Sequence, residues 1–307
     1  NSVAAVAASL GTRIQGGRSV TDLSGAGPFP IIKYPQFSGG LNVIDSNDFS
    51  TYHGLVVQVQ RQFSRGMSAQ VSYTRSRALD TRSFDPTFTV VSTANNQQAT
   101  SSPWNMYDRK LNYATADFDR PNAVQANWVY ELPLGKGRRF ASTSNPAIER
   151  LVGGWSINGI FSYFTGRPFT VFSGSNTYSS VVQTPANCGG CPRSMGEVFD
   201  DPRTGLKWYF NDTERAAFST PAAGQLGDTT RNYFRRDRTL GLDAAFIKRT
   251  RITERFNLEL RCDATNILNT PTFGFPTATI TSATFGRIYN SVATASRKMQ
   301  LGAKLNF

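Results

Sequence analysis

The side chains that could do chemistry are few in this chain of 307 residues. Cys188 and Cys191 enclose two glycines, a spacing that occurs in zinc sites and in thiol redox motifs. Zinc would need two further ligands, and a redox motif would need a strand that leads into a helix, which the surrounding sequence does not predict. The pattern favours a loop disulfide formed in an oxidising compartment, with two free thiols as the alternative.

The other candidate catalytic groups are equally sparse. His53 is the single histidine, and its place at the expected start of a strand favours an interfacial polar residue over a ligand or triad member. The sequence has no His-Glu-x-x-His, no Gly-x-Ser-x-Gly and no phosphate-binding glycine loop. Two acidic pairs lie in expected loops: Asp117 with Asp119, and Asp200 with Asp201. Calcium would need a more complete set of oxygens, so we expect solvated loop charge. The sequence predicts no enzyme, no metal and no cofactor.

The charge balance is strongly basic, with 33 Lys and Arg against 21 Asp and Glu. The basic residues are spread over turns and loops without a stripe or run, which disfavours nucleic acid as a partner. Attraction to anionic lipid headgroups or to an acidic ligand fits better. Mean hydropathy is −0.34. No apolar stretch is long enough for a membrane helix, but the strands of a membrane barrel give no such stretch either.

Seven segments of about ten residues alternate apolar and polar side chains, the period of a β-strand. The apolar positions are Leu55, Val57, Val59; Met67, Ala69, Val71, Tyr73; Val124, Ala126, Trp128, Tyr130, Leu132; Trp155, Ile157, Gly159, Phe161, Tyr163; Leu240, Leu242, Ala244, Phe246; Phe256, Leu258, Leu260, Cys262, Ala264; and Met299, Leu301, Ala303, Leu305, Phe307. This length suits a tilted strand that crosses hydrocarbon and is about twice the soluble average. We expect an all-β fold, an antiparallel transmembrane β-barrel segment.

The connections between these segments alternate in length. Residues 64–66 and 249–254 are short, and 133–153 is longer, with a helical turn expected at 146–151 after an Asn145 cap. The connections 80–119, 173–238 and 269–297 are long. Barrels of outer membranes place short turns in the periplasm and long loops outside. Six aromatic residues fall near the short-turn end on the apolar face and predict an interfacial girdle: Phe63, Tyr130, Trp155, Phe246, Phe256 and Phe307.

The polar face and the long loops hold the candidate binding residues. The lumen-lining candidates are Gln58, Gln60, Gln70, Asn127, Asn158, Glu259 and Arg261. The candidate ligand contacts in the loops are Trp104, Tyr107 and Tyr178, for which packing within the loops is the other expectation. A soluble sandwich would show the same alternation with its apolar face inside. A secreted β-sandwich that binds carbohydrate or protein is therefore an alternative.

The two ends of the chain differ in character. Residues 1–50 contain Pro28, Pro30 and Pro35 and predict an irregular extracellular loop region, followed by barrel strands over 51–307. The last strand ends on an aromatic residue, which is typical of a strand that closes an outer-membrane barrel. Its apolar side forms the predicted barrel-insertion terminus: Leu301, Ala303, Leu305 and Phe307.

Several motifs resemble TonB-dependent outer-membrane receptors, most closely the Oar-like subgroup. They are residues 255–274 (RFNLELRCDATNILNTPTFG), Phe285-Gly-Arg-Ile, the terminus with Gln300, Lys304 and Phe307, Tyr34-Pro-Gln-Phe, and Tyr73-Thr-Arg-Ser-Arg-Ala-Leu-Asp. The resemblance implies a 22-stranded barrel in the outer membrane of a Gram-negative cell envelope. It also implies an N-terminal plug, an inner-membrane energy transducer and uptake of a scarce small ligand or peptide.

This chain departs from that pattern, because the sequence shows no plug and far too few strands. About seven strands would leave an open edge, which lipid does not tolerate. We therefore expect an incomplete barrel, the C-terminal part of a larger receptor, in the bacterial outer membrane. Its expected partners are membrane lipid, the barrel-assembly machinery through the last strand, and a TonB-type transducer only through the missing plug. A free-standing porin or adhesin barrel, with 1–50 adding one strand, is the alternative.

Overall fold

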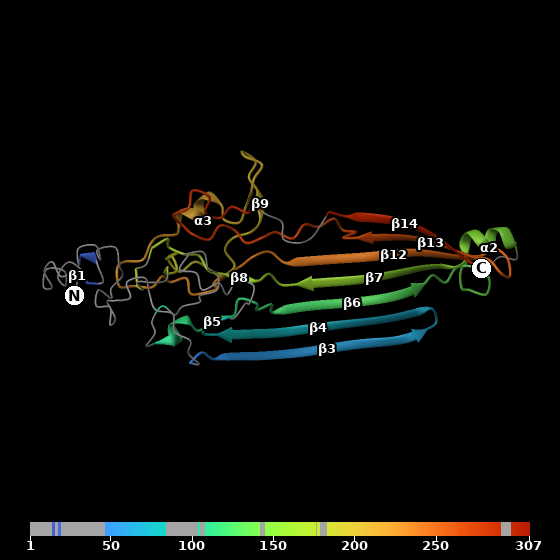
Figure 1. Ribbon diagram of the computed structural model, residues 1–307, viewed down its shortest axis with the longest axis horizontal. Coiled ribbons are helices and arrows are strands. Elements are labelled where there is room, and N and C mark those ends of the chain that lie inside the picture. The colour runs from blue at the N-terminus through green and yellow to red at the C-terminus, as the bar shows by residue number, and fades with distance from the viewer. Residues whose placement is uncertain are drawn as a thin grey trace.

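A computed structural model describes residues 14–15, 18–19, 47–83, 104, 108–141, 145–175, 177–178, 183–289 and 296–307. Seven long strands lie side by side in one antiparallel layer (Figure 1). They are β3 (Ser50–Ser64), β4 (Met67–Asp80), β6 (Asn122–Glu131), β7 (Trp155–Phe164), β12 (Thr239–Arg251), β13 (Asn257–Thr265) and β14 (Lys298–Asn306). Each long strand pairs with the next one along the chain, and the short β5 (Ala114–Thr115) adds to β4. The expected seven strands are confirmed, although β12 runs five residues beyond Phe246.

The strand register places the apolar positions of all seven segments on one face of the sheet. One row of directly paired residues crosses six strands: Met67, Tyr130, Ile157, Phe246, Cys262 and Leu301. On the seventh strand, Val59 pairs with Val71. Since side chains alternate between the two faces, these pairings fix the face of every other position. The sequence pattern therefore predicted the common face correctly.

Nothing in the described part of the chain packs across this apolar face as a second sheet. Leu55 is 62% exposed and Leu301 is 80% exposed. A β-sandwich would bury such side chains between two sheets about 10 Å apart. Even the shortest long strands have nine residues. At about 3.3 Å per residue they extend about 30 Å, enough to cross the hydrocarbon of a bilayer with some tilt.

The short connections gather at one end of the sheet, together with the C-terminus (Figure 1). The β3–β4 turn holds Arg65 and Gly66 at positive φ. The connection from β6 to β7 contains α2 (Pro146–Val152), whose Asn145 cap accepts a hydrogen bond of 2.9 Å from the Ala147 N–H. The cap and the proline at the first helical position are as predicted from the sequence. In the described residues no helix is both long and apolar enough to span a membrane.

The long connections meet at the opposite end and carry short elements. These are η2 (Arg109–Asn112), β8 (Pro168–Phe169), β9 (Phe199–Asp200), β10 (Lys207–Trp208), α3 (Asp212–Ala216) and β11 (Phe234–Arg235). Strand β8 pairs with β11, and β9 pairs with β10. A further pair, β1 (Ile14–Gln15) with β2 (Arg18–Ser19), lies within the predicted loop region 1–50. Most of that region lies outside the described residues.

The described residues of the connections 165–238 and 266–289 pack around a common aromatic core, and we call this unit the loop cluster. Phe169, Phe210 and Phe234 are fully buried, and their ring centroids lie 5.3–6.4 Å apart. Phe218 and Phe285 complete the group: Phe218 makes edge contacts with Phe210 and Phe285, and the Phe285 ring lies tilted beside Phe210. Aromatic rings bury much apolar area each, so a few of them stabilise a small core. The long connections thus have a hydrophobic core of their own as well as exposed residues.

Two glycines at the short-turn end have the same backbone strain but differ in how closely other atoms pack against them. Gly154 and Gly137 both have φ near +70°, but only at Gly154 would an added methyl group overlap the Arg249 carbonyl of β12. Gly137 faces open space. We expect Gly154→Ala to lower the free energy of unfolding by about 2–3 kcal/mol more than Gly137→Ala, because overpacking adds to the shared φ strain. Urea unfolding in detergent measures the difference, and equal losses would contradict the β7–β12 contact.

Candidate functional site

The second face of the sheet carries the predicted lumen residues. Gln60 pairs with Gln70, Gln70 with Asn127, and Asn127 with Ile160, in one row across four strands. Asn158 belongs to the next row, which continues through Ala245 and Asp263 to Gln300. Gln58, Arg261 and Glu259 occupy further rows on this face, and Glu259 is ion-paired with Arg249 at 2.8 Å. The register therefore gathers all seven candidates on one polar wall.

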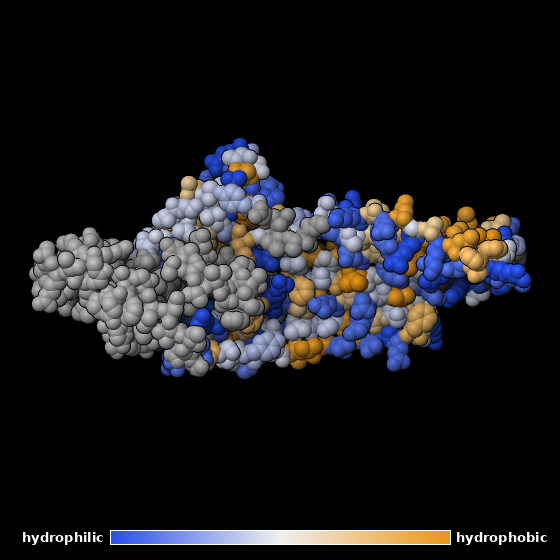
Figure 2. Space-filling model, in the orientation of Figure 1, coloured by the Kyte–Doolittle hydropathy of each residue, from blue (hydrophilic) through white to orange (hydrophobic). Residues whose placement is uncertain are grey.

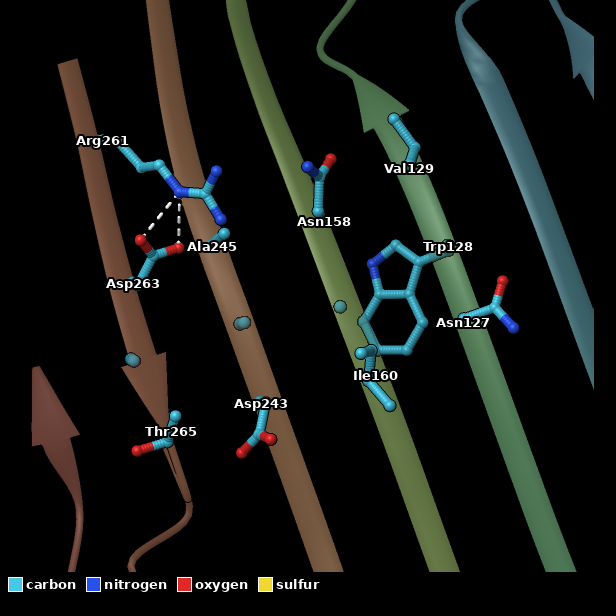
Figure 3. Close-up of a pocket in the computed structure, with 13 residues that line it drawn as sticks. Asn127, Trp128, Val129, Asn158, Ile160, Asp243, Ala245, Arg261, Asp263 and Thr265 are labelled. Carbon is cyan, nitrogen blue, oxygen red and sulfur yellow. Dashed lines mark hydrogen bonds and ion pairs between the residues drawn. The ribbon is translucent and has the colours of Figure 1, made fainter. Parts of the chain in front are cut away.

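A hollow of about 350 Å³ lies on this wall over β6, β7, β12 and β13, and we call it the wall hollow (Figure 3). Asn127, Asn158, Asp243, Arg261 and Asp263 supply its polar groups. The Arg261 Nε–H donates to both carboxylate oxygens of Asp263 at 2.7 Å. Within the described residues, the buried Asn158 Oδ1 has no hydrogen-bond partner. The wall hollow thus offers one amide acceptor and a paired charge to a polar solute.

A second hollow, of about 220 Å³, lies in the loop cluster, and we call it the β9–α3 hollow. Phe199 and Trp208, which are paired across β9 and β10, form its aromatic side. The Arg215 guanidinium stacks 4.1 Å from the Trp208 ring centroid. Among the described residues, the buried Trp208 Nε1 has no hydrogen-bond partner. An aromatic surface beside an unused donor suits a ligand that has both apolar and polar faces.

Charged groups line the rest of the β9–α3 hollow. Arg203 donates to Asp212 at 2.8 Å, and Arg215 also pairs with Asp212. Hydrogen bonds from Arg203 and then from Arg215 lower the pKa of the Asp212 carboxyl, so it is ionised at neutral pH. Sequence reasoning placed ligand contact in the 173–238 connection but missed these residues. The sequence signal that could have located the β9–α3 hollow is the capping box of α3, in which Asn211 and Glu214 exchange hydrogen bonds.

Arg231 joins the β4–β6 connection to the loop cluster through a buried network. Its side chain is fully buried and pairs with Asp80 and, at 3.2 Å, with Asp117. It also donates to the Asp80 carbonyl at 2.7 Å and to the Asn112 carbonyl at 3.2 Å. One guanidinium thus serves two carboxylates and two carbonyls, which satisfies most of its donors. The network fixes the β4–β6 connection against the loop cluster.

Neighbouring residues extend this network. The Asn232 amide donates to Asp117 at 2.6 Å and to the Thr115 carbonyl at 2.7 Å. Arg235 pairs with Asp119, whose other carboxylate oxygen accepts from the Ala78 N–H at 2.7 Å. Burial raises the pKa of the Asp117 carboxyl, and the Asn232 and Arg231 donors oppose that rise.

These contacts correct the expectation of solvated acidic loop pairs. Asp117, Asp119 and Asp201 are buried, and Asp201 accepts hydrogen bonds from Arg203 and Thr204 in its own turn. Only Asp200 is exposed, paired with Lys207 at 2.6 Å. In the part of the chain that the structure describes, no three His, Cys, Asp or Glu side chains group as a metal site would require.

The remaining sequence candidates have different surroundings. Trp104 is 3% exposed and its indole donates to the Gln183 carbonyl at 3.1 Å, so it packs between two connections. Tyr178 is partly buried, and Tyr107 lies outside the described residues. Cys188 and Cys191 form a disulfide in the loop cluster. The same loop is held by Asp228, which accepts from the N–H groups of Cys188 and Gly190.

The family model of an outer membrane beta barrel domain matches residues 7–300. The chain belongs to this family. Its place is therefore the bacterial outer membrane, and the apolar face of the sheet is the face toward lipid. In an outer membrane beta barrel domain the short-turn end is the periplasmic side and the loop cluster is extracellular.

Among solved structures, the chain is similar to the outer membrane transporter YddB from Escherichia coli. The identity is 12% and the TM-score is 0.39, over 85% of this chain and 26% of that chain. The chain thus spans about a quarter of the length of that transporter. No curated protein matches the chain.

Substitution of Arg231 tests the buried network of this outer membrane beta barrel domain. We expect Arg231→Met to destabilise the loop cluster by about 3–5 kcal/mol, because two carboxylates would stay buried without their partner. The control Arg203→Met removes the ion pairs of an exposed guanidinium, which solvent screens, and should leave the stability of the loop cluster nearly unchanged. Chymotrypsin cleavage of the loops on intact cells reads both variants, with more than about 100-fold faster cleavage expected for Arg231→Met alone. Equal cleavage rates would contradict the network.

Proposed function

We propose that this chain is the C-terminal barrel part of a TonB-dependent receptor of the Oar-like kind, which takes up a scarce ligand through the outer membrane. The proposal is one of transport, without a catalytic step. Family membership places the chain in the outer membrane. The motif at residues 255–274 supports the receptor assignment by resemblance, and it runs from the end of the β12–β13 turn through β13 into the connection after it.

The single observation that carries the transport proposal is the polarity of the wall opposite the lipid face. Asn127, Asn158 and Arg261 line the wall hollow, and Gln and Ser residues of β3, β4 and β6 continue the same polar face. A polar inner wall is typical of a barrel whose lumen holds water or another segment of protein. The β9–α3 hollow lies at the extracellular end and would be the first contact for an incoming ligand.

The free edges of the sheet define the partners in this proposal. In the described residues, β3 and β14 are end strands that pair on one side only. Lipid does not tolerate unpaired strand edges, so further strands must close the barrel. A plug held against the polar wall would gate it and would contact the TonB-type transducer. The exposed apolar side of β14, from Leu301 to Phe307, would be the part that the barrel-assembly machinery receives.

Solute uptake by cells that carry a variant of the β9–α3 hollow tests this function. Deleting all of 173–238 would also remove Arg231 and Arg235, so a point variant is sharper. We expect cells with Trp208→Ala to deplete one class of solute from a defined medium at less than about a tenth of the wild-type rate, as measured by mass spectrometry of the medium. Phe118→Ala, which removes an exposed aromatic residue of the β4–β6 connection, is the control and should leave depletion unchanged.

Energy dependence separates a receptor from a passive pore. We expect a protonophore, or deletion of the TonB-type transducer, to abolish the same depletion in wild-type cells. Depletion that continues without the transducer would contradict the receptor and favour a free-standing porin.

A further inference from the structure

The positive charge of the chain is concentrated at the short-turn end. We define the turn-end surface as residues 64–66, 132–141, 145–154 and 249–256. These 31 residues contain eight Lys and Arg against two Glu. The described residues of the long connections at the other end, within 80–121, 165–238 and 266–297, contain 15 Lys and Arg against 11 Asp and Glu. The excess of basic over acidic residues is thus six on the turn-end surface and four in the much larger long connections.

The eight basic side chains of the turn-end surface are all exposed. They are Arg65, Lys136, Arg138, Arg139, Arg150, Arg249, Arg251 and Arg255. Arg138 pairs with Glu131 at 3.0 Å, and Arg249 pairs with Glu259. Glu149, one of the two acidic residues, accepts the Lys136 backbone N–H at 2.6 Å. Even after these pairs are counted, the surface presents a surplus of exposed cations, which favours an anionic partner.

Apolar side chains are exposed on the same surface. Leu151 is 76% exposed and Ile148 is 49% exposed, and their spacing of three places both on one side of α2. Phe140 and Ile252 are exposed as well. Figure 2 shows hydrophobic residues gathered at the α2 end of the molecule, beside hydrophilic ones. Exposed apolar residues next to basic ones are typical of segments that lie in a membrane interface.

Hydrogen bonds hold α2 at the edge of the lipid face. The Trp155 indole N–H donates to the Leu151 carbonyl at 3.1 Å, and Trp155 belongs to the apolar face of β7. The Thr250 hydroxyl donates to the Arg150 carbonyl, and Arg150 donates to the Ile252 carbonyl, both at 3.3 Å. The helix therefore continues the surface that faces lipid, at the depth of the predicted aromatic girdle.

We propose that the turn-end surface is a binding site for anionic phospholipid of the periplasmic leaflet. The helix α2 lies in the membrane interface with Leu151 and Ile148 among the acyl chains. Exposed basic side chains, with Lys136 and Arg139 foremost, bind the headgroup phosphates. Charge complementarity selects anionic over zwitterionic lipid, and the apolar contacts add affinity for both. The loop cluster, with its near balance of charges, has no such preference.

Native mass spectrometry of the full-length protein in detergent tests this proposal. The probes are phosphatidylglycerol and phosphatidylcholine with identical acyl chains. We expect at least threefold more phosphatidylglycerol adducts on the wild type, and loss of that preference in Lys136→Gln/Arg139→Gln. The matched control Arg238→Gln/Arg297→Gln removes two exposed charges at the other end and should keep it. Equal binding of the two lipids by the wild type, or equal loss in both double variants, would overturn the proposal.

A second pair of variants tests the apolar contact. Leu151→Ser should reduce adducts of both lipids, while Leu268→Ser, which changes an exposed leucine of the long-loop end, should not. If Leu151→Ser bound both lipids as well as the wild type does, α2 would not be part of the binding site. Heat-modifiable migration on a gel shows that each variant is folded. Because these measurements read lipid and not uptake, they stand apart from the transport proposal.

Discussion

The structure depends on a sheet whose apolar face has no protein cover. Paired rows such as Phe246, Cys262 and Leu301 keep that face continuous from strand to strand. In water, each Å² of exposed apolar surface forgoes about 25 cal/mol of stabilisation, so such a face would drive aggregation. Hydrocarbon removes this cost. It also requires that every backbone group be paired, which the long strands achieve with their neighbours; among the described residues the outer edges of β3 and β14 stay open.

The extracellular end is stabilised by different interactions from those of the membrane-spanning strands. There the chain is surrounded by water and builds an ordinary core, with Phe169, Phe210 and Phe234 at its centre. Buried ion pairs join this core to the wall, because Arg231 reaches Asp80 at the end of β4. Removal of charges from water is costly unless every donor and acceptor is used, and here the carbonyls of Asp80 and Asn112 and the Ser83 hydroxyl complete the set for Arg231. The loops are therefore held in one arrangement relative to the strands.

The strands and their common face could be predicted from the sequence because alternation is a local signal. The Asn145 cap of α2 is local as well. The Arg231 network could not be predicted, since its ion pairs join residues 151 and 114 positions apart. For the same reason Asp117 and Asp119 were expected in solvent, and the β9–α3 hollow was missed although its connection was singled out. The seven lumen candidates lie on one face of the sheet because alternation assigns every second position of a strand to the same face, and their role in a lumen stays a prediction.

The contact between the apolar face and lipid is the central claim, and the most direct measurement is the accessibility of spin labels in the membrane-embedded full-length protein. Labels at Val71 and Leu260 report the apolar face, and labels at Gln70 and Arg261 report the polar one. The account predicts that oxygen, which concentrates in hydrocarbon, relaxes the first pair more strongly, and that a water-soluble nickel complex relaxes the second pair more strongly. If both reagents were excluded from Val71 and Leu260, these side chains would lie in a protein interior and the account would be contradicted.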